Sequence, residues 1–167
     1  MTKIGILSDT HSYLDEQVFH YFEKVDEIWH IGDVGNPEVT DRLAEFKPLR
    51  CVYGNIDGKE IRAQFPLDLH FELEQIPVFM THIGGYPGRY TTRVREILDS
   101  TKPKLYLAGH SHILKVMMDK KRGILHINPG AAGNHGWHKV RTCIRLTMDA
   151  GDMRDLEVVE LGGRGRG

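Results

Sequence analysis

Apolar runs and helical stripes alternate along the first third of the chain. The run Ile4, Ile6 and Leu7 predicts a buried strand, and Val18, Phe19 and Phe22 lie on one face of a helix. The predicted elements are a strand over residues 3–7, a helix over 12–24, a strand over 27–33, a helix over 37–46 and a strand over 49–53. This β-α-β-α-β order predicts a sheet with helices packed on it.

The pattern becomes rich in strands after residue 68, with one intervening helix. Strands are predicted over residues 68–74, 76–81, 104–108, 114–118, 124–127, 142–148 and 156–159, and a helix over 91–100. We therefore predict two sheets packed face to face with helices outside, in a single domain over residues 1–161. The Gly/Arg-rich segment 162–167 is predicted to be a flexible tail.

Composition and charge limit the function classes. Hydrophobic residues make up 40% of the 167 residues and charged residues 27%, as in ordinary soluble proteins. The net charge of -1 gives no basic field for nucleic acid, and two arginines in the tail are too few to provide one, so we expect no nucleic-acid partner. No apolar run is long enough to span a membrane. No signal peptide precedes the first strand, so we expect a cytoplasmic protein.

The two cysteines, Cys51 and Cys143, lie in apolar segments and are expected to be buried thiols, with a disulfide between them as an open alternative. A homo-oligomer is compatible with the sequence, which does not specify the oligomeric state.

Metal-competent side chains follow five of the apolar runs. They are Asp9, His11, Asp33, Asn55, His82, His110 and His112. Each has an ordinary alternative explanation. Asp9 could cap a helix, Asp33 and Asn55 could form turns, and the histidines could be exposed surface residues. Together they offer oxygen and nitrogen without thiolate, which suits Mn²⁺, Fe, Mg²⁺, Ni²⁺ or Zn²⁺. Seven ligands exceed the four of a structural zinc and suggest two metals that share a carboxylate.

The order of these motifs resembles that of the calcineurin-like metallophosphoesterases. The matching segments are Asp9-Thr10-His11, Gly32-Asp33, Gly54-Asn55, His82 and Gly109-His110-Ser111-His112. The short chain and its Asn128-Pro129-Gly130 are similar to the small YfcE-like phosphodiesterase branch, which includes the Vps29 proteins. The resemblance implies an α/β fold that is a four-layer α/β/β/α sandwich of two mixed sheets flanked by helices.

The resemblance also implies a division of the ligands. Asp9, His11 and His112 would hold a first metal ion, and Asn55, His82 and His110 a second, with Asp33 bridging both. It implies a phosphoesterase, most simply a phosphodiesterase, that hydrolyses a small phosphodiester or nucleotide-like substrate. Two cations about 3.5–4 Å apart can lower the pKa of a shared water, so that a bridging hydroxide attacks phosphorus. Mn²⁺ is the first choice of metal, with Fe, Ni, Zn or Mg as alternatives.

The sequence departs from the family pattern after Asn55. Many relatives carry His or Cys where this chain has Ile56, and isoleucine can neither donate a proton nor stabilise charge. General-acid assistance is worth about 10²–10⁴-fold, so we expect slow turnover of alkyl esters and faster turnover with good leaving groups. His135 and His138 are candidate replacements for the missing acid.

Three further residues carry predicted roles with alternatives. Asp57 is predicted to assist catalysis by orienting a ligand imidazole, or else to form a turn with the next glycine. The ligand Asn55 is also predicted to contact the substrate. Tyr86 and Arg89 could contact substrate phosphate, or else lie on the surface. The alternative function is a Vps29-like scaffold that retains the fold and weak metal binding. The missing histidine favours it, whereas the complete ligand set argues against it.

Overall fold

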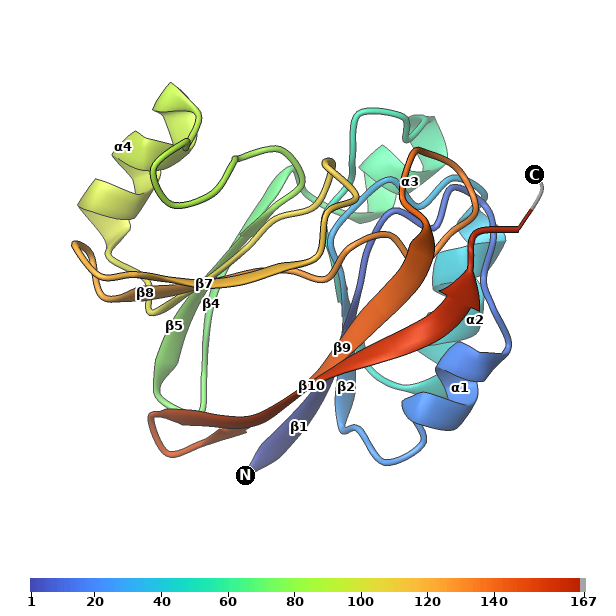
Figure 1. Ribbon diagram of the computed structural model, residues 1–167, viewed down its shortest axis with the longest axis horizontal. Helices are drawn as coiled ribbons and strands as arrows, with labels where there is room; N and C mark the ends of the chain where they lie inside the picture. The colour runs from blue at the N-terminus through green and yellow to red at the C-terminus, as the bar shows by residue number, and fades with distance from the viewer. Residues whose placement is uncertain (166–167) are drawn as a thin grey trace.

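Two five-stranded mixed sheets form the centre of the computed structural model, which describes residues 1–165 (Figure 1). The first sheet has the order β10-β9-β1-β2-β3, and β1, β2 and β3 are parallel. Its strands are β1 (Thr2–Leu7), β2 (Glu27–His30), β3 (Leu49–Cys51), β9 (Val140–Asp149) and β10 (Asp152–Gly163). The last two strands run antiparallel to β1 and to each other.

The second sheet has the order β4-β5-β6-β8-β7, with β5, β6 and β8 parallel and an antiparallel strand at each edge. Its strands are β4 (Asp68–Leu73), β5 (Ile76–Thr81), β6 (Leu105–Leu107), β7 (Lys115–Asp119) and β8 (Ile124–Asn128). Four helices accompany the two sheets in residues 1–165: α1 (Gln17–Tyr21), α2 (Pro37–Phe46), α3 (Lys59–Gln64) and α4 (Thr92–Thr101).

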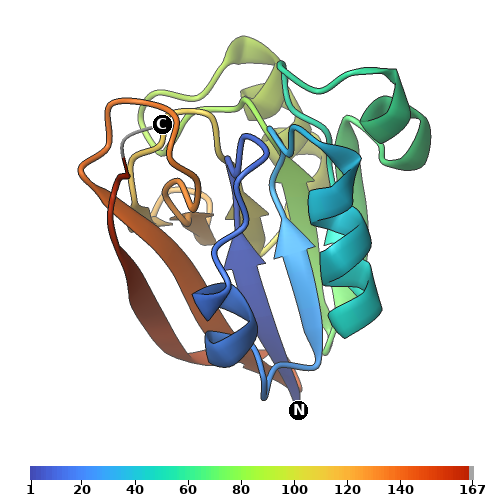
Figure 2. The same ribbon diagram turned by 90° about the vertical axis from the view of Figure 1, so that its right-hand side faces the viewer.

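Three apolar clusters separate four layers. Between the sheets, β1 and β2 contribute Ile4, Ile6 and Trp29, which pack in one cluster with Met80 and Leu107 of the second sheet. Helices α1 and α2 cover the outer face of the first sheet, as Figure 2 shows, and α4 covers that of the second. Fully burying an apolar side chain contributes about 1.5–3 kcal/mol, so these clusters stabilise the stack. The predicted α/β/β/α sandwich is confirmed.

Strand β1 is covered on both faces, which explains its continuous apolar sequence. Ile4 and Ile6 face the second sheet, whereas Leu7 belongs to the cluster beneath the helices. Gly5 lies under α1, where an added Cβ would be 2.7 Å from the Phe22 ring. A strand covered on both sides has no polar face, so its apolar run is continuous.

The first and third helices differ from prediction. The helix expected from residue 12 begins only at Gln17, because Ser12 has a left-handed backbone (φ 71°) and the amide of Tyr13 closes a turn onto the Thr10 carbonyl. Helix α3 was not predicted. It buries only Ile61 and has no capping side chain, so it lacks both an apolar stripe and a start signal.

The predicted tail is partly paired. Gly162 and Gly163 belong to β10 opposite β9, and the amides of Arg164 and Gly165 donate to Lys139 and Asn134. Strand β10 therefore ends at residue 163, four residues beyond the predicted strand end at 159 and two beyond the predicted domain boundary at 161. The Arg141 side chain holds this end by donating to the carbonyls of Leu161 and Gly163. The rest of the predicted tail, residues 166–167, lies outside the described residues.

Both cysteines are buried free thiols, as predicted. Among residues 1–165, no helix is both long enough and apolar enough to cross a membrane.

Candidate metal centre

The seven predicted ligands lie at the carboxyl ends of parallel strands in both sheets. Asp9 and His11 follow β1, Asp33 follows β2 and Asn55 follows β3, whereas His82 follows β5, and His110 and His112 follow β6. Backbone bonds extend the alignment beyond the strands: Asp9 donates to the Gly32 carbonyl and His11 to that of Asp33, each at 3.0 Å. Parallel strands end at the same edge, so their side chains meet there.

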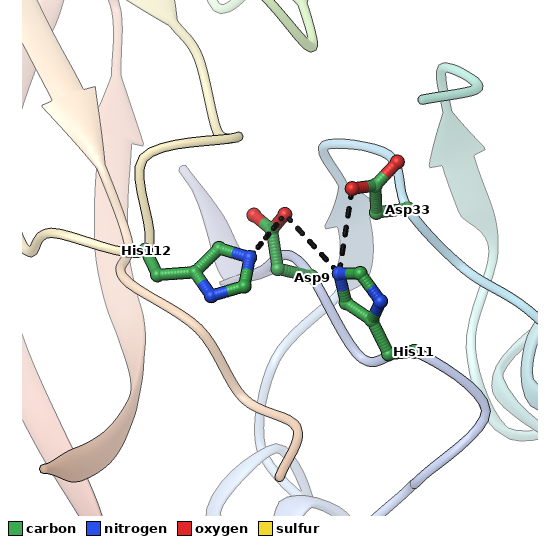
Figure 3. Close-up of side chains that lie close together, drawn as sticks. All are labelled: Asp9, His11, Asp33 and His112. Carbon is green, nitrogen blue, oxygen red and sulfur yellow. Dashed lines mark ion pairs between the residues drawn. The ribbon is translucent and has the colours of Figure 1, made fainter. Parts of the chain in front are cut away.

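The first ligand group contains Asp9, His11, Asp33 and His112 (Figure 3). His112 Nε2 lies 3.1 Å from Asp9 Oδ1, and His11 Nε2 lies 3.3 Å from Asp33 Oδ2. All four ligand atoms are within 4.8 Å of one another.

The second ligand group contains Asp33, His82 and His110. His82 Nε2 lies 3.2 Å from Asp33 Oδ2, the same oxygen that faces His11. Asn55 joins this group, because its Oδ1 is 3.1 Å from His110 Nδ1. Asp33 therefore belongs to both groups, at the position expected of a bridging carboxylate.

Three buried ligand atoms have no hydrogen-bond partner among residues 1–165. They are Asp9 Oδ1, His11 Nε2 and His82 Nε2. Burying a polar atom without a partner costs about 1–3 kcal/mol, and a cation between them would satisfy all three. Carboxylate oxygen, amide oxygen and imidazole nitrogen are suitable donors for divalent cations, so these residues fit metal ions.

Hydrogen bonds to the outer atoms of the ligand side chains fix which atom of each faces the cluster. His82 Nδ1 lies 2.7 Å from the Ile31 carbonyl, which leaves Nε2 for a metal when Nδ1 carries the proton. Asp9 Oδ2 accepts from the Ser8 hydroxyl at 2.6 Å, so Oδ1 faces the cluster. Burial tends to raise the pKa of Asp33, but the His11 and His82 side chains and the Ile56 amide lower it well below its usual range. Asp33 is therefore an anion near neutral pH.

Five of the ligands have left-handed backbone. The φ angles are 54° for Asp9, 45° for His11, 55° for Asp33, 73° for His110 and 63° for His112. Such conformations cost about 1–3 kcal/mol each and persist where surrounding contacts fix them. The concentration of this strain at the ligands indicates a functional site.

Comparisons with known proteins agree with this geometry. Residues 2–151 match the Calcineurin-like phosphoesterase superfamily domain. A "Probable metallophosphoesterase" of Methanothermobacter thermautotrophicus is 30% identical over 171 residues, covering 95% of this chain and 92% of the relative. The chain belongs to the calcineurin-like phosphoesterase superfamily.

Two further proteins resemble this chain, one in sequence and one in fold. A phosphodiesterase of Methanocaldococcus jannaschii is 28% identical and aligns with 77% of this chain and 82% of its own. The crystal structure of Chaetomium thermophilum Vps29 has a TM-score of 0.77 at 13% identity, covering 99% of this chain and all of that one. At that identity the likeness concerns the fold alone.

Within this calcineurin-like site, the Asp57 carboxylate forms no hydrogen bond or ion pair with an imidazole of residues 1–165. The carboxylate accepts three backbone amides, those of Val34 at 3.2 Å, Gly35 at 2.9 Å and Gly54 at 2.8 Å. The predicted role as an imidazole acceptor is wrong for this geometry, because both oxygens hold the loops after β2 and β3. Asp57 positions Asp33 and Asn55 indirectly.

The sequence did not predict the positioning roles of two further residues, Asn128 and His30. Asn128 donates to the Gly109 carbonyl and to Ser111, and so holds the loop that carries His110 and His112. His30 is fully buried, which lowers its pKa to about 4, and it contacts the Thr10 hydroxyl and the Gly32 amide. The sequence feature that could have indicated these roles is that each polar residue ends an apolar strand, His30 in β2 and Asn128 in β8.

Two of the predicted substrate residues, Tyr86 and Arg89, lie in the loop that follows His82. Tyr86 lines a small pocket that also contains His110, and the Lys115 ammonium sits 3.7 Å above its ring. Arg89 is exposed, and its side chain forms no ion pair or hydrogen bond among residues 1–165. Tyr86 therefore lies at the rim of the site, whereas Arg89 lies on the surface.

The candidate replacements for the missing acid differ from each other. His138 bonds the Gly133 carbonyl at 2.8 Å, which fits a structural role. His135 is exposed and stacks on His11 with ring centroids 4.7 Å apart. Ile56 is 45% exposed beside the ligands, and its amide donates to Asp33 Oδ1 at 3.1 Å.

Proposed function

We propose that this protein is a dinuclear metal-dependent phosphodiesterase that hydrolyses a small phosphodiester. The supporting observation is the pair of ligand groups that share Asp33 and enclose buried ligand atoms without partners. Asp9, His11 and His112 would hold one cation, and Asn55, His82 and His110 the other. Mn²⁺ is our first choice because these oxygen and nitrogen donors suit it.

Bound cations would supply a water of lowered pKa and neutralise phosphate oxygens. The protein's own contribution is positioning. Asp33 is held anionic and fixed by the Ile56 amide, and His82 is oriented by the Ile31 carbonyl. Asn55 and His110 are exposed at the mouth of the site, where the Asn55 amide could donate to a phosphoryl oxygen.

The test is hydrolysis of bis(p-nitrophenyl) phosphate with Mn²⁺ and with EDTA. We expect activity only with metal, and we expect Asp33→Ala to lower kcat/KM by about 10²–10³-fold or more, because it removes charge from both groups. Asp41→Ala, at an exposed position of α2, should retain activity. Activity that survives EDTA, or none with any divalent metal, would overturn the proposal.

A second prediction concerns the leaving group. Ile56→His should accelerate hydrolysis of an alkyl diester by about 10²-fold or more, since the imidazole can protonate an alkoxide. The aryl diester should change little, because p-nitrophenolate leaves without a proton. Equal effects on both substrates would show that Ile56 does not face the leaving oxygen.

A catalytically weak interaction scaffold is the second candidate, and it is supported by Ile56 and by the Vps29 neighbours in fold. The same assay separates the two: a scaffold predicts Mn²⁺ binding without turnover of the activated aryl diester.

A further inference from the structure

A second pocket, of about 380 Å³, opens beside the second ligand group. Asn55 and His82 line one side of it, and Tyr53, Arg62, Leu67 and Ile83 line the remainder together with polar residues of β5 and α4. We call it the Tyr53 pocket. Its volume is within the range of small-molecule sites, about 300–1,000 Å³. A group attached to a phosphorus held by the ligands could therefore reach it.

The walls of the Tyr53 pocket expose apolar surface. Leu67 is 44% exposed and Ile83 is 40% exposed, although Ile83 directly follows the buried ligand His82. Apolar side chains gathered in a concave site beside polar ligands are typical of pockets that bury the organic part of a substrate.

Of the two arginines that line the pocket, one is paired with a carboxylate and the other is not. Arg93 forms a bidentate ion pair with Asp68, at 2.6 and 3.1 Å. Arg62 forms no ion pair in the described part of the chain, and its Nε donates to the Asp57 carbonyl at 2.6 Å. Arg62 is thus the cation of this pocket whose charge is not balanced by a neighbouring carboxylate.

One face of the Arg62 guanidinium lies against an aromatic ring that also lines the pocket. The guanidinium carbon lies 4.6 Å from the centroid of the Tyr53 ring. The hydrogen bond to the Asp57 carbonyl and a longer contact to that of Asn55, at 3.4 Å, restrain the group. A guanidinium plane stacks well on aromatic rings.

We propose that the Tyr53 pocket binds a planar aromatic group carried by the substrate phosphorus, such as an aryl ring or a nucleobase, with Arg62 as the specificity-determining residue. This inference rests on the proposed function, since it requires that the two ligand groups hold the phosphorus. Leu67 and Ile83 supply the apolar walls, and Arg62 supplies a cationic face for the ring.

The test compares phenylphosphonate with methylphosphonate, which differ only in the group on phosphorus and cannot be hydrolysed. We expect calorimetry on the Mn²⁺-loaded protein to show about tenfold tighter binding of phenylphosphonate, a ratio typical of small differences in apolar contact. Arg62→Gln and Leu67→Ser should each remove most of that preference and change methylphosphonate affinity less than about twofold.

Matched controls are Arg95→Gln, on the exposed side of α4, and Val158→Ser, at a 43% exposed position of β10. Both should keep the wild-type preference. Equal affinity of the wild type for the two phosphonates would overturn the pocket assignment, as would variants that weaken both ligands equally.

The two proposals fail in different ways. Mn²⁺-dependent diesterase activity together with equal phosphonate affinities refutes the pocket and leaves the phosphodiesterase intact. Preferential phenylphosphonate binding, lost in the two pocket variants, without any hydrolysis refutes the phosphodiesterase and supports the pocket.

Discussion

Single glycines allow the ligands of this site to approach one another. A Cβ on Gly54 would lie 2.1 Å from Asp33 Oδ1, and one on Gly109 would lie 2.8 Å from Asp9 Oδ2. The carboxylates therefore occupy space that any other residue would fill with its own side chain. The glycines of the Gly54-Asn55 and Gly109-His110 motifs are required for steric reasons as much as for turns.

Gly54→Ala should displace Asp33 and disable the centre. We expect a loss of about 1–3 kcal/mol in unfolding free energy from overpacking, and a loss of Mn²⁺ affinity measured by calorimetry. Gly58→Ala is the matched control, since nothing lies within 4 Å of its added Cβ. Wild-type Mn²⁺ affinity in Gly54→Ala would contradict the steric argument.

The elements that carry the ligands were predictable because each of their apolar runs is followed by a polar side chain. These runs form β1, β2, β3, β5 and β6. Periodicity and motif order were enough to indicate that these ends meet. Helix α3 was not predictable, because its six residues bury one side chain, and so the position of Arg62 was missed. The contacts of Asp57 and Asn128 join segments up to 23 residues apart in sequence and leave no local pattern.

Strand β8 makes stability depend on pH. Burial of His126 against Tyr106 lowers the pKa of its imidazole to about 4 in the folded protein, below the usual 6.5. As pH falls, His126 therefore takes up a proton in the unfolded chain before it does so in the folded protein. The stability that its neutral form contributes is complete above pH 6.5 and is lost as pH falls towards 4. We expect His126 to account for a loss of about 2 kcal/mol between pH 7 and pH 5.

Urea unfolding of the wild type and of His126→Gln at both pH values measures this loss. The variant should lose about 2 kcal/mol less than the wild type over the interval, whatever its stability at pH 7. An identical loss in both proteins would show that His126 does not titrate on unfolding in this range.

The whole molecule should be more stable with metal than without it. The buried ligand atoms without partners are brought together only in the folded state, so a cation should bind the folded protein and not the unfolded chain. A cation present at a hundred times its Kd should then raise the free energy of unfolding by about 2.7 kcal/mol. For a chain of this size that corresponds to a rise in Tm of about 5–10 °C. Calorimetry with Mn²⁺ and with EDTA measures it, and Asp33→Ala should lose most of the rise. The same Tm in both conditions would contradict metal binding at these residues.

Each ligand group takes side chains from both sheets: Asp9, His11, Asp33 and Asn55 from the first, and His82, His110 and His112 from the second. A small rotation of one sheet against the other would separate the ligands even if every strand stayed intact. We therefore expect the apolar layer between the sheets, which includes Trp29 and Ile127, to be a determinant of metal affinity. By thermodynamic reciprocity, cations that prefer the aligned arrangement would hold the two sheets in it.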